Sequence, residues 1–130
     1  MSLREDIAGR VEALEEAYEF FLAYAAQGVA DHRASKSGGQ LRDSLDRATE
    51  AVDGIGACLR ALVKSQALEP VDGWGDFVDV VERDAAACHA ALRLVAAQPA
   101  VSSQLVDNLN ANIHLRALLT DFFLLDELLR

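Results

Sequence analysis

The 130-residue chain has little of what marks secreted or membrane-embedded proteins. Its two cysteines, Cys58 and Cys88, are too few for a disulfide scaffold and lack the CxxC spacing of common zinc sites. The longest uncharged stretch, 94–106, is interrupted by Pro99 and is too short to span a bilayer. The amino terminus carries charges where a secretory signal has its apolar region. We therefore expect a cytoplasmic protein without membrane contact.

Basic side chains are also scarce, because lysine and arginine together number 12 against 21 aspartates and glutamates. The net charge is −9, and no segment gathers enough basic residues to neutralise a run of phosphates, so we do not expect nucleic-acid binding. Hydrophobic residues make up 52% of the chain, which distinguishes it from disordered proteins. A single folded domain over residues 1–130 is expected.

What the sequence has in abundance is helical periodicity. Ser2 and Glu5 fit a capping box at the start of the first helix. In three segments apolar residues then recur at alternating steps of four and three, as on one face of an α-helix. These stripes are Ile7, Val11, Leu14, Tyr18, Phe21 and Ala25; Leu41, Leu45, Ala48, Val52, Ile55, Leu59 and Leu62; and Trp74, Val78, Val81, Ala85, Cys88, Leu92 and Val95.

Two features complicate this pattern. Gly54 and Gly56 interrupt the second helix, although we expect a continuous helix that tolerates both. The alternation of polar and apolar residues over 108–116 is typical of a strand, but a lone strand would have no partner, so a helix is favoured.

With the polar segment 31–40 as the main loop, we expect an all-α protein, an antiparallel four-helix bundle with long helices. Its helices span roughly residues 3–30, 41–68, 74–97 and 101–129.

The fourth helix has more apolar surface than one core face can absorb. Between Ala117 and Leu129, apolar side chains cover well over half of its circumference. Such a helix is either central in its fold or buried against another subunit. We therefore expect a homodimer formed through this helix. The candidate interface residues are Leu118, Phe122, Phe123, Leu125 and Leu129.

The beginning of the same helix is unusually polar. Asn112 and Arg116 are four residues apart and share one helix face. Together with neighbouring polar residues they form a candidate polar groove for a ligand or a polar dimer seam. The residues of this candidate groove are Asn108, Asn112, His114 and Arg116.

Groups that could carry catalysis or bind a cofactor are few. Cys88 continues the apolar stripe of the third helix, and His89 is rotated about 100° from it, so both cannot easily bind one metal ion. We expect no metal, no cofactor and no catalytic residue, and we interpret the cysteines as packing residues. The carboxylates on the first helix, Glu12, Glu15, Glu16 and Glu19, are interpreted as a solvated face.

The sequence thus favours a non-enzymatic accessory protein, a homo-oligomeric helical bundle that binds another protein. One alternative is a small-molecule, metal or haem-binding bundle with a cavity near Tyr18, Cys58, Cys88, His89 and His114. Another is a histidine phosphotransfer domain, because the chain fits such domains in size, acidity and expected bundle architecture. Neither His89 nor His114 is followed by the lysine and glycine that accompany the phosphorylated histidine of that family.

Overall fold

The computed structural model describes residues 2–130, which form helices and no strand. The prediction of an all-α protein is therefore confirmed. None of these helices combines the length and the hydropathy that crossing a lipid bilayer requires. The elements are α1 (Leu3–Ala26), the short 3-10 helix η1 (His32–Ala34), α2 (Gly38–Val52), α3 (Ile55–Ser65), α4 (Val71–Ala96), α5 (Ser103–Ala111) and α6 (Ile113–Leu128).

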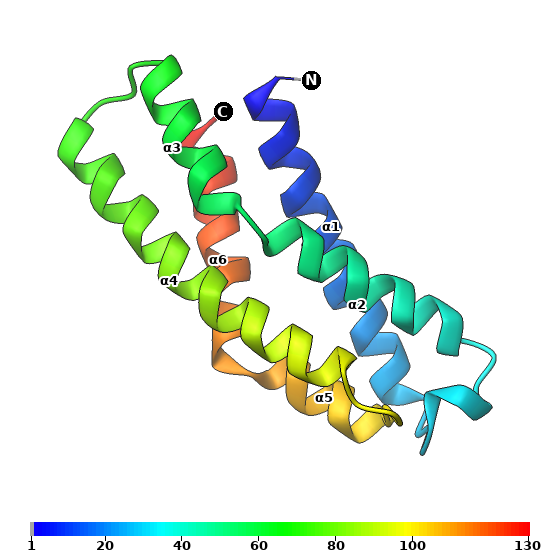
Figure 1. Ribbon diagram of the computed structural model, residues 1–130. Helices are drawn as coiled ribbons and strands as arrows, with labels where there is room; N and C mark the ends of the chain where they lie inside the picture. Colours follow the sequence, from blue (N-terminus) through cyan, green and yellow to red (C-terminus); the bar gives the residue numbers. More distant parts are fainter. Residues whose placement is uncertain (1) are drawn as a thin grey trace.

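The two longest helices, α1 and α4, organise the packing. Each of the shorter helices α2, α3, α5 and α6 contacts both of them (Figure 1). However, α5 packs mainly on α1, whereas α6 packs mainly on α4. The two ends of the chain lie at the same end of the molecule, so α1 and α6 run in opposite directions (Figure 1).

The core is built from the predicted stripes. All seven stripe residues of α4 are buried, from Trp74 to Val95, and so are all seven from Leu41 to Leu62. On α1 the stripe is buried with small changes, because Ala17 and Tyr24 are buried while Tyr18 and Ala25 remain partly exposed. Helical periodicity thus identified the core faces of these helices correctly.

The prediction of a continuous helix over 41–68 is wrong, because the chain breaks between α2 and α3. Asp53 is extended, and Gly54 has a φ of 78°, a left-handed conformation that only glycine adopts without strain. Gly56 allows a close approach of α4, because a Cβ atom at this position would clash with the Glu82 side chain. Gly54 therefore allows the break, and Gly56 allows the close contact with α4. The prediction that one continuous helix tolerates both glycines is wrong.

The prediction of a continuous helix over 101–129 is also wrong. Ser102 caps α5 by accepting a hydrogen bond from Leu105 N–H at 3.0 Å, and that helix ends at Ala111. Asn112 is extended, and its Oδ1 accepts a hydrogen bond from His114 N–H at 2.9 Å, so it caps the new helix α6.

The remaining boundaries differ less from the predicted ones. The first helix ends at Ala26 and not near residue 30. The predicted loop 31–40 contains η1 and the first turn of α2. Ser2 Oγ accepts a hydrogen bond from Glu5 N–H at 3.1 Å, as expected for the amino-terminal cap.

Three arginines bind backbone carbonyls at the carboxyl ends of other helices. Arg10, on α1, donates to Ala51 O at 3.0 Å and also to Asp53 O, at the break that follows α2. Arg4 donates to Leu129 O at the end of α6. These carbonyls have no partner within their own helix, and a cation there also interacts favourably with the helix dipole.

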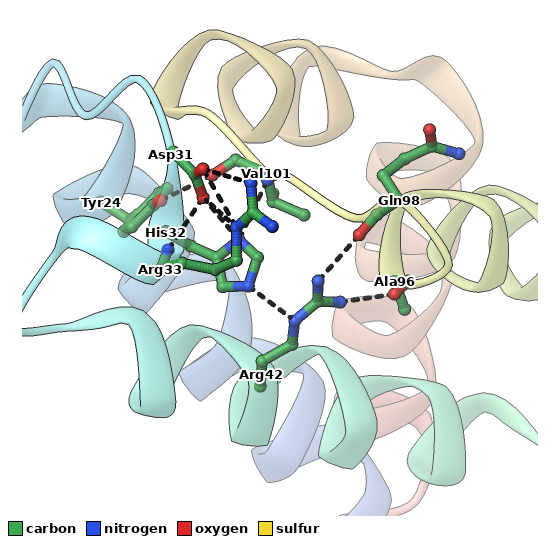
Figure 2. A network of polar contacts seen from close by, with 8 residues as sticks. All are labelled: Tyr24, Asp31, His32, Arg33, Arg42, Ala96, Gln98 and Val101. Atoms are coloured by element: carbon green, nitrogen blue, oxygen red, sulfur yellow. Dashed lines mark hydrogen bonds and ion pairs between the residues drawn. The ribbon is translucent and has the colours of Figure 1, made fainter.

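The third arginine, Arg42, belongs to a buried polar network (Figure 2). It donates to Gln98 O at 2.8 Å and to Ala96 O, at the end of α4, and its Nε lies 3.2 Å from His32 Nε2. His32 Nδ1 accepts from Val101 N–H at 3.0 Å. The network ties the loop after α1 and the start of α2 to the loop after α4.

The Arg42 contacts should contribute measurably to stability. We predict that Arg42→Met lowers the free energy of unfolding by about 1.5–3 kcal/mol, because two partly buried carbonyls lose a charged hydrogen-bond donor. The control is Arg47→Met on the same helix, which removes an exposed ion pair with Glu16 and should cost at most about 1 kcal/mol. Urea unfolding of both variants measures the difference, and equal losses would contradict a capping role for Arg42.

Candidate functional site

The most promising binding surface is a groove between α1 and α6, with a volume of about 570 Å³. It exists because the break at Asn112 lets α6 leave α1 and pack mainly on α4. Both walls show spacings of three and four residues, so each wall is one helix face. The groove is lined by Glu15, Tyr18, Glu19 and Leu22 from α1 and by Arg116, Leu119, Thr120 and Phe123 from α6.

Two large apolar side chains of this groove are open to solvent. Leu22 is 50% exposed and Phe123 is 55% exposed, one on each wall. Leu119 lines the floor and is almost completely buried. Apolar side chains that line a shared concave surface are typical of a binding site, whereas scattered exposed ones need no explanation.

Within residues 2–130, the charged groups that line the groove form no ion pair. Burial raises the pKa of Glu15, and the nearby carboxylates of Asp126, Glu19 and Glu12 raise it further. Arg116 forms no side-chain hydrogen bond or ion pair with any described residue, although it lines the same groove. The groove therefore presents both an acidic region and a free guanidinium to whatever binds there.

The candidate interface residues of the last helix occupy different environments. Leu118, Phe122 and Leu125 have no exposed surface and pack in the core of this chain. Leu129 is partly buried against that core. Phe123 alone among the five is largely exposed. The large apolar side chains that α6 leaves exposed are Ile113, Phe123, Leu124 and Leu128.

The four residues of the candidate polar groove do not act as one site, although Arg116 N–H donates to Asn112 O at 3.2 Å. Asn108 is exposed, and its Oδ1 accepts from Gln104 Nε2 at 3.3 Å. Asn112 caps α6, and His114 is exposed. Arg116 is the one that lines the groove between α1 and α6.

The cysteines and histidines do not form a common site. Cys58 Sγ lies 3.4 Å from Asp6 Oδ2, and Cys88 is buried, where desolvation raises the pKa of its thiol to about 12. His89 lines a separate cleft between α4 and the junction of α2 and α3, while His114 is exposed on α6. Within residues 2–130, no three His, Cys, Asp or Glu side chains are grouped as a metal ion would require.

The sequence offered no local signal for two polar features. One is the buried network around His32 and Arg42, which joins segments far apart in the chain. The other is a pair of carboxyls, Asp84 on α4 and Asp121 on α6. Burial, together with the hydrogen bond and negative charge of Asp84, raises the pKa of Asp121 to about 7. Asp121 Oδ2 is buried without another partner, so a shared proton is the natural way to satisfy it.

Leu22 was missed for a different reason. It lies four residues after Tyr18 and seven after Glu15, so a second face of α1 was visible in the sequence. A lone leucine on this face does not indicate a binding surface until a second helix places the exposed Phe123 on the other wall of the same groove.

No protein-family model, curated protein or solved structure matches the chain. Its function must therefore be inferred from its own surfaces.

The carboxyl pair predicts a specific pH dependence of stability. Because the folded pKa of Asp121 lies near 7 and its ordinary value is 3.8, the folded state keeps a proton that the unfolded state releases. The contribution of the Asp121 carboxyl to the free energy of unfolding should thus be largest below about pH 4. It should be lost as the pH rises through about 7. Solvent screening reduces the effect, so we expect a loss on the order of 1 kcal/mol.

Asp121→Asn should remove this loss. The variant should be more stable than the parent chain at alkaline pH, and the difference in stability between the two should be smaller at acidic pH. The matched control is Asp43→Asn, at an exposed position of α2, whose pH profile should parallel that of the parent chain. Thermal unfolding from about pH 5 to about pH 8 measures all three. An unchanged pH slope in Asp121→Asn would contradict the assignment.

Proposed function

We propose that this chain is a non-enzymatic interaction protein of the cytoplasm, an antiparallel four-helix bundle that acts as a homo-oligomer and binds protein helices. In this view α2 with α3, and α5 with α6, each count as one broken helix of the bundle. The observation that carries the proposal is the groove between α1 and α6, with Leu22 and Phe123 exposed on opposite walls.

The shape of the groove supports a helix as its occupant. Its two walls are helix faces, and a third amphipathic helix packs into such a groove through side chains at steps of three and four. The exposed leucine and phenylalanine would supply apolar contact area, and the charged groups would form a polar rim. Glu15, Glu19 and Arg116 provide that rim.

The chemistry of the groove gives little support to catalysis. Its titratable groups are two glutamates, one tyrosine and one arginine, and its one aliphatic hydroxyl, on Thr120, donates to Ala117 O of its own helix at 2.9 Å. The thiol of Cys88 lies elsewhere and is buried. An interaction surface accounts for these residues better than a reaction does.

Site-specific photo-crosslinking in the protein's own host cell tests the proposal. A benzoylphenylalanine residue is placed at position 22, at position 123 or, as a control, at position 94. Leu94 is 67% exposed on α4 and does not line the groove. We expect the same discrete covalent adduct from positions 22 and 123 and none from position 94.

A second substitution makes this test specific. Phe123→Asp should abolish the adduct formed from position 22, because it places a charge in the apolar contact. Equal adduct yields from all three positions, or an adduct from position 22 that is insensitive to Phe123→Asp, would refute the groove as a docking site.

A further inference from the structure

We propose that the groove between α1 and α6 binds a cationic amphipathic helix of a partner protein, which places its lysines or arginines along the α1 wall. This inference rests on the proposed function, because it names the chemistry of the partner that the same groove takes. The observation that carries it is a row of carboxylates on that wall.

The α1 wall bears three glutamates on one helix face. Glu12, Glu15 and Glu19 follow one another at steps of three and four, and Leu22 continues the face three residues later. Glu15 and Glu19 line the groove, and Glu12 is close enough to raise the pKa of Glu15. Within residues 2–130, none of these three glutamates forms an ion pair.

The chain itself does not compensate this negative charge. Burial raises the pKa of Glu15, the carboxylates around it raise the pKa further, and no basic side chain lowers it. One of these carboxylates, on Asp126 of α6, is paired with Arg130, so the uncompensated charge belongs to α1. A cation placed against the α1 wall would offset the repulsion among its carboxylates.

The arginine of the groove stands apart from this row. Arg116 lies at the start of α6, and because α1 and α6 run in opposite directions, it lies toward the Leu22 end of the α1 wall (Figure 1). It is not among the side chains that shift the pKa of Glu15. Arg116 thus leaves the acidic part of the groove to a partner, and it would itself bind one acidic side chain near the end of the partner helix.

The apolar part of the groove fits the other side chains of such a helix. Leu119 forms the floor, and Leu22 and Phe123 are exposed on opposite walls. An amphipathic helix presents an apolar stripe with polar residues beside it, and the aliphatic stems of lysine and arginine extend the apolar contact. From Glu12 to Leu22 α1 rises by about 15 Å, which corresponds to roughly three turns of a partner helix.

The same charges disfavour other occupants of the groove. A nucleic acid or an anionic membrane surface would be repelled by the row of glutamates and by the net charge of −9. A second copy of this chain brings the same acidic surplus. A convex helix with basic side chains matches both the shape and the charge of the groove.

Selection from a displayed library of helical peptides tests the chemistry of the partner. Each peptide has about 18 residues, or roughly five turns of helix. Its apolar stripe is fixed at steps of three and four, and the positions beside the stripe hold lysine or glutamate with equal frequency. The library is selected on the parent chain at about 0.15 M salt, where charges farther apart than roughly 8 Å are largely screened. We expect lysine to outnumber glutamate on one side of the stripe by at least about fivefold.

Variants of the α1 wall show whether this preference comes from the groove. Glu15→Lys combined with Glu19→Lys should invert the preference to glutamate, although the chain keeps a net negative charge. A preference caused by overall charge would remain for lysine. The matched control, Asp46→Lys combined with Glu50→Lys, reverses two exposed charges of α2 outside the groove and should keep the preference for lysine.

The peptide most enriched on the parent chain is then measured by fluorescence anisotropy. Its dissociation constant should rise at least about tenfold for the reversed α1 wall and less than about twofold for the control. Binding of glutamate-bearing peptides by the reversed variant shows that this variant is folded. Glu15→Gln combined with Glu19→Gln adds no charge, and it should lose the lysine preference while still binding through the apolar stripe.

Three results would overturn the proposal. These are a lysine preference that survives both changes of the α1 wall, an equal use of lysine and glutamate on the parent chain, and a library that yields no binder.

The outcomes also separate this inference from the proposed function. If positions 22 and 123 crosslink to a partner while the library shows no lysine preference, the groove docks a partner of other chemistry and only the cationic helix is wrong. If light scattering shows a dimer of the parent chain that Phe123→Asp dissociates, a second copy occupies the groove, and the cationic helix is again wrong. If neither groove position crosslinks to any protein, the proposed function itself is wrong.

Discussion

Every helix end in this protein leaves backbone carbonyls that need a hydrogen-bond donor, and arginines from other helices supply it at three of these ends. Arg4 binds the end of α6, Arg10 the end of α2 and Arg42 the end of α4. A helix can stop inside a packed structure only if its last carbonyls are satisfied. These contacts therefore fix where the helices end and how the loops lie against each other.

The break between α5 and α6, at which none of these arginines binds, shapes the surface. The break at Asn112 lets α5 pack mainly on α1 and α6 mainly on α4. A groove opens where α6 departs, and Leu22 and Phe123 line it without being covered. The candidate binding surface is thus a consequence of a helix cap.

The distribution of charge follows from the small number of basic side chains. The chain has 12 basic side chains for 21 acidic ones, and several of the arginines bind backbone carbonyls. Acidic groups are consequently left to face one another, as Asp84 and Asp121 do between α4 and α6. At the groove, burial and the carboxylate of Asp126, which is itself ion-paired with Arg130, raise the pKa of Glu15. Carboxyls that lie close to one another in this way make stability depend on pH.

The sequence by itself determined the helical class and the core, because burial of apolar side chains at steps of three and four depends on local spacing alone. The stripes from Leu41 to Leu62 and from Trp74 to Val95 are buried as predicted. It also indicated that the last helix has surplus apolar surface. It did not indicate which of those residues are covered, since Leu118 and Phe123 differ only in what the fold packs against them.

Only the tertiary structure decided the breaks, the groove and the polar pairs. Gly54 and Asn112 are each compatible with a helix or with its end. At Gly54 the distant Arg10 satisfies freed carbonyls, and at Asn112 the break is accompanied by a cap from the Asn112 side chain. The pairing of Asp84 with Asp121 requires two helices to meet in one register. Local pattern therefore fixes what each helix buries, and contacts between distant residues fix where helices stop and what the surface presents.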